Sequence, residues 1–177
     1  AEFVTGQRVG SLSADLTTFV PGRQVPDEAR IAVRWPGGAR GSIWLSQVAV
    51  GNENALSFRI FGDRAALSWH QERPDRLEMA ELGHAPRSIT RGSPSAGPAS
   101  LRASRVPSGH PEGYIEAFAQ IYRDAADLLE AWPASPAAEI ADELPGLVEG
   151  IRGMDFIDAA LASDRAGSAW VSLPPRG

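Results

Sequence analysis

Short turns between segments of alternating polarity constrain this fold more than any other feature of the sequence. Between residues 9 and 79, apolar and polar residues alternate in six stretches, which is the pattern of half-buried strands. The stretches are joined by turn-forming segments such as Pro36-Gly37-Gly38, Gly51 to Asn54, and Gly62 to Arg64. A parallel crossover needs about a dozen residues or more, so strands joined this closely pair antiparallel. The first half of the chain is therefore expected to be an antiparallel meander.

The second half has helical periodicity. Apolar residues from Ile115 to Leu129 recur at helical spacing and predict an amphipathic helix with one buried face, and Pro145 to Asp164 predicts a second. A Pro/Ala-rich linker over 131–139 separates them, and residues 169–173 can return as a short strand. Residues 83–109 are rich in Pro, Ser, Gly and Arg and are expected to form a long loop.

Together these elements predict an α+β fold. We expect a mostly antiparallel, open-faced sheet of about six strands with two main helices covering one face. Two helices cannot cover both faces, so the other face, which by alternation displays residues such as Trp44, must meet solvent, a ligand or another protein. Residues 1–6 end in Gly and resemble the tail of a helix, so residues 7–177 are expected to form the domain.

Composition excludes several classes of function. The formal charge of -5 argues against a nucleic-acid partner, and no apolar run is long enough to cross a membrane. The chain has no cysteine and no lysine, which excludes thiolate chemistry, Schiff-base chemistry and a P-loop lysine within it. Three histidines without acidic partners at ligand spacing predict no metal site. The composition is that of a cytoplasmic protein.

The loop-to-helix junction at residues 109–122 carries the first candidate site residues. Pro111 suits a first helical position, and Glu112 is expected to complement the helix dipole. His110 can exchange hydrogen bonds with a ligand, or it can be a loop residue that caps the helix. Tyr114 can bind substrate through its hydroxyl, or its ring can pack in a core or interface.

The remaining candidates lie in the sheet half. Gln47, Asn52 and Asn54 carry neutral amides that could form hydrogen bonds with a ligand, although turn chemistry also explains both Asn residues. Trp44 and Trp69 could stack on the ring of a ligand, but large aromatic side chains on a sheet face more often form a core or a subunit interface. We therefore assign Trp44 and Trp69 to a subunit interface, and we assign no catalytic residue and no metal ligand to the chain.

Several short motifs, in order, resemble one known family along essentially the whole chain. They are Ala1-Glu-Phe-Val-Thr-Gly6; Gly41 to Val50 with Ser46-Gln47-Val48; Phe58-Arg-Ile-Phe-Gly62 leading to Ala66-Leu67-Ser68-Trp69; Gly109-His-Pro-Glu-Gly-Tyr114 with Glu116-Ala-Phe118; and Gly150-Ile-Arg-Gly-Met154 with Phe156-Ile157. The chain resembles the C-terminal domain of the Gfo/Idh/MocA oxidoreductases, named for glucose-fructose oxidoreductase and inositol dehydrogenase.

The resemblance implies the C-terminal substrate-binding and oligomerisation domain of an enzyme that oxidises a sugar or polyol with NAD or NADP. It also implies an upstream Rossmann domain, which holds the cofactor, and two catalytic motifs, Glu-Lys-Pro and Asp-x-x-x-His. The Rossmann fingerprint and both motifs are absent from this sequence. The chain alone is therefore expected to bind no cofactor and to be inactive, and to form homo-oligomers through its open sheet. The alternative is a non-catalytic, stand-alone α+β module that self-associates through the same sheet.

Overall fold

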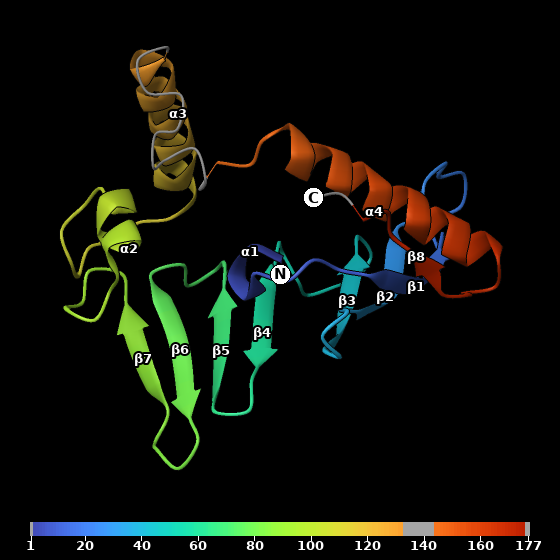
Figure 1. Cartoon of the computed structure of the whole chain (residues 1–177), viewed down its shortest axis with the longest axis horizontal. Helices are drawn as coiled ribbons and strands as arrows, with labels where there is room; N and C mark the ends of the chain where they lie inside the picture. The colour runs from blue at the N-terminus through green and yellow to red at the C-terminus, as the bar shows by residue number, and fades with distance from the viewer. Residues whose placement is uncertain (1, 133–143, 176–177) are drawn as a thin grey trace. The chain divides into compact units, whose positions relative to one another are not determined.

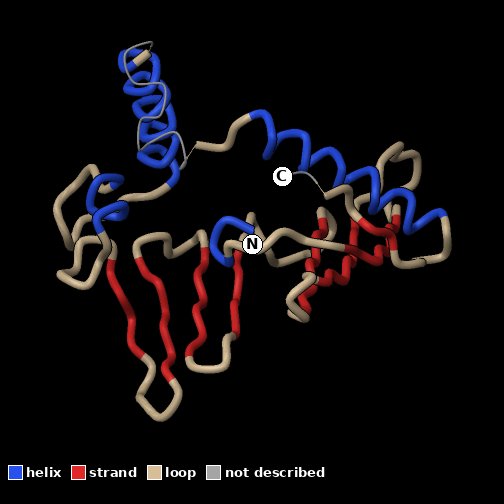
Figure 2. Tube along the Cα trace, viewed as in Figure 1, coloured by secondary structure: helices blue, strands red, loops and turns tan. Residues whose placement is uncertain are grey.

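Eight strands in two antiparallel sheets, with four helices, make up the part of the chain that the structure describes, residues 2–132 and 144–175 of a computed structural model (Figure 1). The chain divides into two units. Unit 1 comprises Ala1–Gly51 and Pro145–Gly177, and unit 2 comprises Asn52–Leu144. Most of the linker predicted over 131–139 lies outside the described residues. The α+β class and the antiparallel pairing are confirmed, and Figure 2 shows the strands in red and the helices in blue.

The sheet of unit 1 has the strand order β3-β2-β1-β8. Its strands are β1 (Ser11–Thr17), β2 (Glu28–Arg34), β3 (Arg40–Ser46) and β8 (Val171–Ser172). The hairpin predicted around Pro36-Gly37-Gly38 is confirmed, because β2 and β3 pair in register from Glu28↔Ser46 to Arg34↔Arg40. The short strand predicted near residue 171 is confirmed as β8, which pairs with β1.

Helix α4 (Leu147–Arg165) covers one face of this sheet and builds the core. Leu12 and Val33 project from the strands and are fully buried, and Ala159 and Ala160 let the helix approach closely. Each large apolar side chain buried in this way contributes about 1.5–3 kcal/mol. All buried apolar side chains among the described residues belong to unit 1.

Side chains of α4 complete the hydrogen bonding of β1. Strand β8 pairs with β1 only at Ser11 and Leu12, which leaves the later N–H groups on that edge without a strand partner. The Ser163 hydroxyl, fully buried, accepts from the Ala14 N–H at 2.8 Å, and the Asp164 carboxylate accepts from the Leu16 N–H at 2.9 Å. Two helix side chains thus stand in for two residues of a neighbouring strand.

The short helix α1 (Glu2–Thr5) is tied to α4 by a two-pronged ion pair. Arg152 donates from Nε to one oxygen of Glu2 at 3.0 Å and from Nη2 to the other at 2.6 Å, and the Val9 N–H adds a third bond at 2.6 Å. Partial burial raises the pKa of Glu2, but the hydrogen bonds from Arg152 and Val9 outweigh it and leave the pKa below its ordinary value. Gly6 follows with φ +63°, as expected for a helix-ending glycine.

Unit 2 consists of a four-stranded meander followed by two helices. Its strands, in both chain order and sheet order, are β4 (Ser57–Phe61), β5 (Ala65–His70), β6 (Arg76–Glu81) and β7 (Arg87–Thr90). They lead into α2 (Pro98–Ala103) and α3 (Tyr114–Ala131). Both β7 and α2 lie within the segment predicted to be a long loop, so that prediction was wrong in part.

The structure also corrects the expected single sheet of about six strands. The meander breaks between β3 and β4, which belong to different sheets. After Ser46 the backbone N–H of Gln47 bonds to the Asp27 carbonyl at 2.8 Å, and the segment up to Leu56 is irregular, with Gly51 at φ +89°. The turn around residue 51 is therefore a connection between sheets.

A further correction concerns α3, whose apolar face was expected to be buried. Ile115, Tyr122 and Leu129 are each about three-quarters exposed (76, 75 and 74 %), whereas Gln120 and Asp124 are buried. The helix packs within unit 2 through polar side chains.

Among the described residues, every helix is too short or too polar to span a membrane.

Candidate functional site

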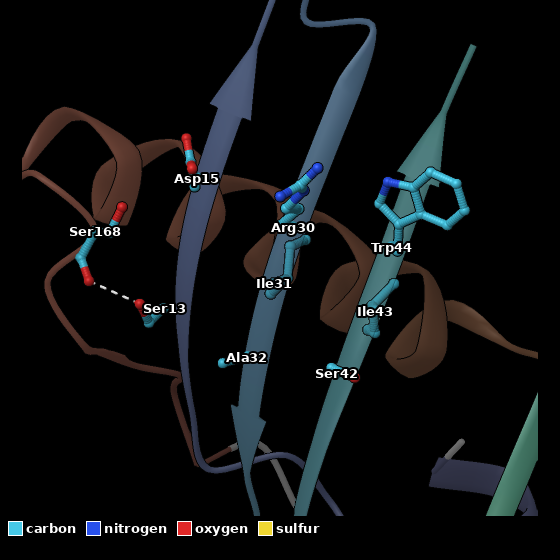
Figure 3. Close-up of a pocket in the computed structure, with 9 residues that line it drawn as sticks. All are labelled: Ser13, Asp15, Arg30, Ile31, Ala32, Ser42, Ile43, Trp44 and Ser168. Carbon is cyan, nitrogen blue, oxygen red and sulfur yellow. Dashed lines mark hydrogen bonds between the residues drawn. The ribbon is translucent and has the colours of Figure 1, made fainter. Parts of the chain in front are cut away.

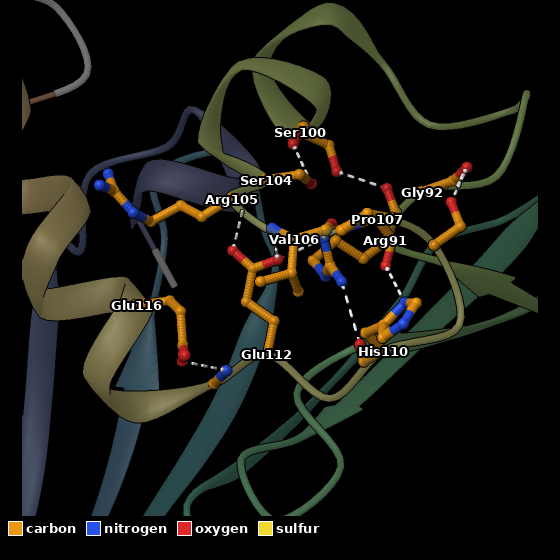
Figure 4. Close-up of polar contacts among 12 residues, drawn as sticks. Arg91, Gly92, Ser100, Ser104, Arg105, Val106, Pro107, His110, Glu112 and Glu116 are labelled. Carbon is orange, nitrogen blue, oxygen red and sulfur yellow. Dashed lines mark hydrogen bonds and ion pairs between the residues drawn. The ribbon is translucent and has the colours of Figure 1, made fainter.

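Glu112 organises the loop that leads from α2 into α3. Its carboxylate is 6 % exposed and accepts from the backbone N–H groups of Arg105 at 2.7 Å and Val106 at 3.3 Å (Figure 4). It also forms an ion pair with Arg91, at the end of β7. The prediction that Glu112 serves the helix dipole was wrong, because α3 begins only at Tyr114 and Glu112 precedes it.

The start of α3 has its own capping carboxylate. Glu116 accepts from the Gly113 N–H at 2.9 Å, and this hydrogen bond lowers the pKa of Glu116 below its ordinary value. Pro111 therefore lies before the helix and not at its first position. The sequence identified the junction correctly, but the acidic residue of the first helical turn is Glu116, four positions after the Glu112 that was predicted to complement the helix dipole.

His110 and Tyr114 flank this junction. His110 is exposed, its ring Nδ1 lies 3.2 Å from the Pro107 carbonyl oxygen, and Arg91 Nη2 donates to the His110 carbonyl at 3.2 Å. Tyr114 is 67 % exposed and its ring lies 4.9 Å from that of Phe118, so the ring packs on its own helix while the phenol remains accessible.

Polar contacts fix α3 against α2 and the loop after it. Arg102 Nη1 donates to the Asp124 carboxylate at 2.6 Å, and Gln120 donates to the same oxygen at 2.7 Å. Arg105 Nη1 reaches the Gln120 amide oxygen at 3.3 Å. These arginines lie in the segment predicted to be a long loop, and they pair with buried side chains of the helix.

The outer face of the unit 1 sheet, on the side away from α4, presents a second candidate site. Asp15, Arg30 and Trp44 lie directly opposite one another on β1, β2 and β3 (Figure 3). They border an open cavity of about 450 Å³, which we call the outer-face cavity. It is lined by Ser13, Asp15, Arg30, Ile31, Ala32, Ser42, Ile43, Trp44 and Ser168. Trp44 is 60 % exposed, which agrees with its expected position on the open face.

The other predicted site residues are scattered over the two units. Gln47 belongs to unit 1, whereas Asn52 and Asn54 belong to unit 2, and the Asn54 amide donates to Gln71 at 3.1 Å. Trp69 is half-buried, with its ring 5.8 Å from that of Phe58 and its indole N–H bonded to a backbone carbonyl at 3.1 Å. Only part of Trp69 is therefore available to a partner.

Carboxylate side chains occupy the start of both long helices. A pyrophosphate is commonly bound by free N–H groups at a helix N-terminus. At both long helices such an N–H is already taken by a carboxylate, Glu116 for Gly113 and Glu149 for Gly146 at 3.0 Å, which adds negative charge. Within residues 2–132 and 144–175, no group of three or more His, Cys, Asp or Glu side chains could hold a metal ion.

Known proteins resemble this chain along nearly its whole length. The Bacillus subtilis protein described as uncharacterized oxidoreductase YfiI is 29 % identical over 169 residues, which are 94 % of this chain and 43 % of YfiI. The crystal structure of an oxidoreductase from Sinorhizobium meliloti matches with 41 % identity and a TM-score of 0.88, over 96 % of this chain and 48 % of that one.

A third match is an inositol dehydrogenase homolog from Azotobacter vinelandii, solved with NADH and myo-inositol. It has 28 % identity and a TM-score of 0.88, over 96 % of this chain and 45 % of that one. This chain spans less than half the length of each of these three proteins. The family model described as GFO/IDH/MocA C-terminal domain matches residues 1–68. These matches and the antiparallel α+β fold support the assignment of the chain as a C-terminal domain of the Gfo/Idh/MocA family.

Proposed function

We propose that the chain is the substrate-binding and oligomer-forming domain of an NAD(P)-dependent oxidoreductase that acts on a hydroxyl of a sugar or polyol. The observation that carries the proposal is the likeness, over 96 % of the chain, to a protein whose structure contains NADH and myo-inositol. That protein is more than twice as long as the matched region, and this chain has no lysine. Cofactor binding and hydride transfer are accordingly assigned to a further domain. The protein itself is proposed to be cytoplasmic.

The residues proposed to meet substrate are His110, Tyr114, Gln47, Asn52 and Asn54. Imidazole, phenol and amide groups match a neutral ligand rich in hydroxyls, because each can donate or accept a hydrogen bond without carrying a fixed charge. The exposure of His110 and Tyr114 supports their part in this assignment.

The outer face of the unit 1 sheet is proposed as the oligomer interface. Trp44 supplies an exposed aromatic anchor, which is common at the centre of interfaces. Asp15 and Arg30 lie side by side on neighbouring strands, so two copies related by a two-fold axis can set each carboxylate against the other copy's guanidinium. Trp69 is proposed as a secondary contact because most of it is covered within its own unit.

The test is an assay of the full-length protein that contains this chain. It is incubated with NAD⁺ or NADP⁺ and a panel comprising myo-inositol, aldohexoses, aldopentoses and linear polyols, and cofactor reduction is followed by absorbance. We expect reduction with at least one member, and reduction with none refutes the proposed activity. Calorimetry of this chain alone is expected to detect no NADH binding, and tight binding there contradicts the assignment of the cofactor to another domain.

The alternative is a non-catalytic module that associates through the outer face, and the exposed Trp44 is the observation in its favour. Light scattering after size exclusion tests the shared interface. Trp44→Ser is expected to shift the oligomer to monomer. Trp170→Phe is the matched control, because the guanidinium of Arg34 covers the Trp170 ring at 3.6 Å, and it is expected to leave the oligomer unchanged. Activity of the full-length protein then separates the enzyme from the module.

A further inference from the structure

The loop that carries His110 is held more firmly than its Pro, Gly and Ser content suggests. Glu112, almost fully buried, accepts two backbone N–H groups and pairs with Arg91. Arg91 in turn donates from Nη1 to the Val106 carbonyl at 3.1 Å and from Nη2 to the His110 carbonyl at 3.2 Å (Figure 4). One buried acid–base pair therefore bonds the loop backbone at four points.

The same loop fixes the backbone of His110 from both sides. Gly109 has φ +84°, a conformation that favours glycine, and the His110 N–H closes the turn on the Pro107 carbonyl at 3.2 Å. The ring then folds back so that its Nδ1 also lies 3.2 Å from that carbonyl. Main chain and ring are thus both directed at one oxygen atom.

This contact selects one form of the imidazole. A carbonyl oxygen can only accept, so Nδ1 must carry the hydrogen, and in the neutral ring Nε2 is left with a lone pair. Because His110 is exposed, that lone pair can meet a ligand. The arrangement makes His110 a preset hydrogen-bond acceptor.

We propose that His110 Nε2 accepts a hydrogen bond from a hydroxyl group of a small polyhydroxylated ligand, and that Glu112 and Arg91 are positioning residues that set its tautomer and orientation. The ligand class rests on the proposed function, whereas the tautomer rests on the loop alone. A hydroxyl donor is the partner that an imidazole lone pair recognises, and a neutral polyol offers several.

The first experiment reads the tautomer directly, by long-range ¹H–¹⁵N correlation spectra of the three histidines in this chain. We expect the Nδ1–H pattern for His110. His84 serves as an internal reference, because its Nδ1 lies 3.2 Å from the Leu82 carbonyl on a turn without a buried ion pair. In Glu112→Gln the His110 pattern is expected to shift toward a mixture while that of His84 stays unchanged. An Nε2–H pattern for wild-type His110, or no response to Glu112→Gln in a folded variant, overturns the positioning argument.

The second experiment tests the ligand with the full-length protein and the polyol it oxidises fastest. His110→Asn keeps a donor at the Nδ1 position but has no atom at Nε2, whereas His110→Gln carries an amide oxygen near Nε2. We expect KM to rise about fivefold in His110→Asn, which is about 1 kcal/mol and typical of one neutral hydrogen bond, with kcat changed less. His110→Gln is expected to restore most of the loss.

Each outcome of the second experiment decides the ligand part of the proposal. A KM of His110→Asn within twofold of wild type, or His110→Gln as impaired as His110→Asn, overturns the acceptor role while the proposed function stands. A wild-type protein that oxidises no polyol refutes the proposed function and the ligand class together, and the spectra still decide the tautomer separately.

Discussion

Replacing Ser163 by Ala tests how much the helix-to-strand bonds contribute to unit 1. The hydroxyl of Ser163 is fully buried, accepts from the Ala14 N–H at 2.8 Å and donates to the Ala169 carbonyl at 2.6 Å. Ala14 is itself buried, so its N–H has no access to water when the hydroxyl is removed. Ala169 is exposed, and its carbonyl can bond to solvent instead.

The expected cost follows from this asymmetry. An unsatisfied buried donor costs about 1–3 kcal/mol, whereas a carbonyl returned to water costs little, so we expect a loss of about 2 kcal/mol. With a urea slope of about 2 kcal/mol per molar for a protein of this size, the midpoint of unfolding falls by about 1 M. Exchange of the Ala14 amide hydrogen through global unfolding should become about 30-fold faster, at 1.4 kcal/mol per tenfold.

The measurement is urea unfolding followed by tryptophan fluorescence, combined with amide exchange read by NMR. Ser13→Ala is the matched control, because the Ser13 hydroxyl also bonds a carbonyl of the α4–β8 connection, that of Ser168 at 2.7 Å, but in solvent. The control is expected to lose less than about 0.5 kcal/mol. Equal losses in the two variants, or an unchanged midpoint in Ser163→Ala, would refute the reasoning from burial.

Three further variants probe other parts of the chain. Glu2→Gln is expected to lose roughly 1 kcal/mol at pH 7 after allowance for solvent screening. Because the folded pKa of Glu2 lies below its ordinary 4.5, wild type keeps this stabilisation above 4.5 and loses it as the pH falls through the lowered pKa; a difference in stability between wild type and Glu2→Gln that does not shrink as the pH is lowered from 4.5 would contradict the role of the Arg152 pair. Gly41→Ala places a Cβ 3.0 Å from carbons of the Trp35 ring and is expected to cost about 1–3 kcal/mol with a shift in Trp emission, so a wild-type Tm argues against tight packing there. Gly109→Ala, at φ +84° but with free space around it, is expected to cost about 1 kcal/mol in unit 2, and Gly109→Asn less; equal stability of all three proteins in urea would exclude the strained turn.

The strands of this fold were largely predictable, and the exceptions have physical causes. Period-two alternation and turn residues identified β1 to β6, because most of these strands alternate between more and less covered residues, with β5 as the exception. Strand β7 was not predicted, because only Ile89 among its four residues is apolar and one residue shows no alternation. Helix α2 was missed although Gly97 followed by Pro98 is a typical helix start, and its residues lack an apolar stripe.

The candidate site was less predictable, because its polar residues are positioned by contacts distant in sequence. Periodicity located α3, but the buried face is set by Gln120 and Asp124, which bond arginines 15 and 22 residues away. Glu112 could be recognised as important but not as the partner of Arg91, since that pairing depends on where β7 ends. Trp44 was placed correctly on the open face. Successive side chains of a strand point to opposite faces of the sheet, so the face on which Trp44 lies follows from the sequence of its hairpin alone.

The two α4 side chains that bond β1 also have a consequence for self-association. A strand edge with free N–H groups is a template on which another chain can add a strand, and such edges promote aggregation. In unit 1, β8 blocks that edge at Ser11 and Leu12 only, and Ser163 and Asp164 occupy the next N–H groups at Ala14 and Leu16. The helix thereby protects the sheet from non-native strand addition, with side chains that no incoming strand can displace without first lifting α4 from the core.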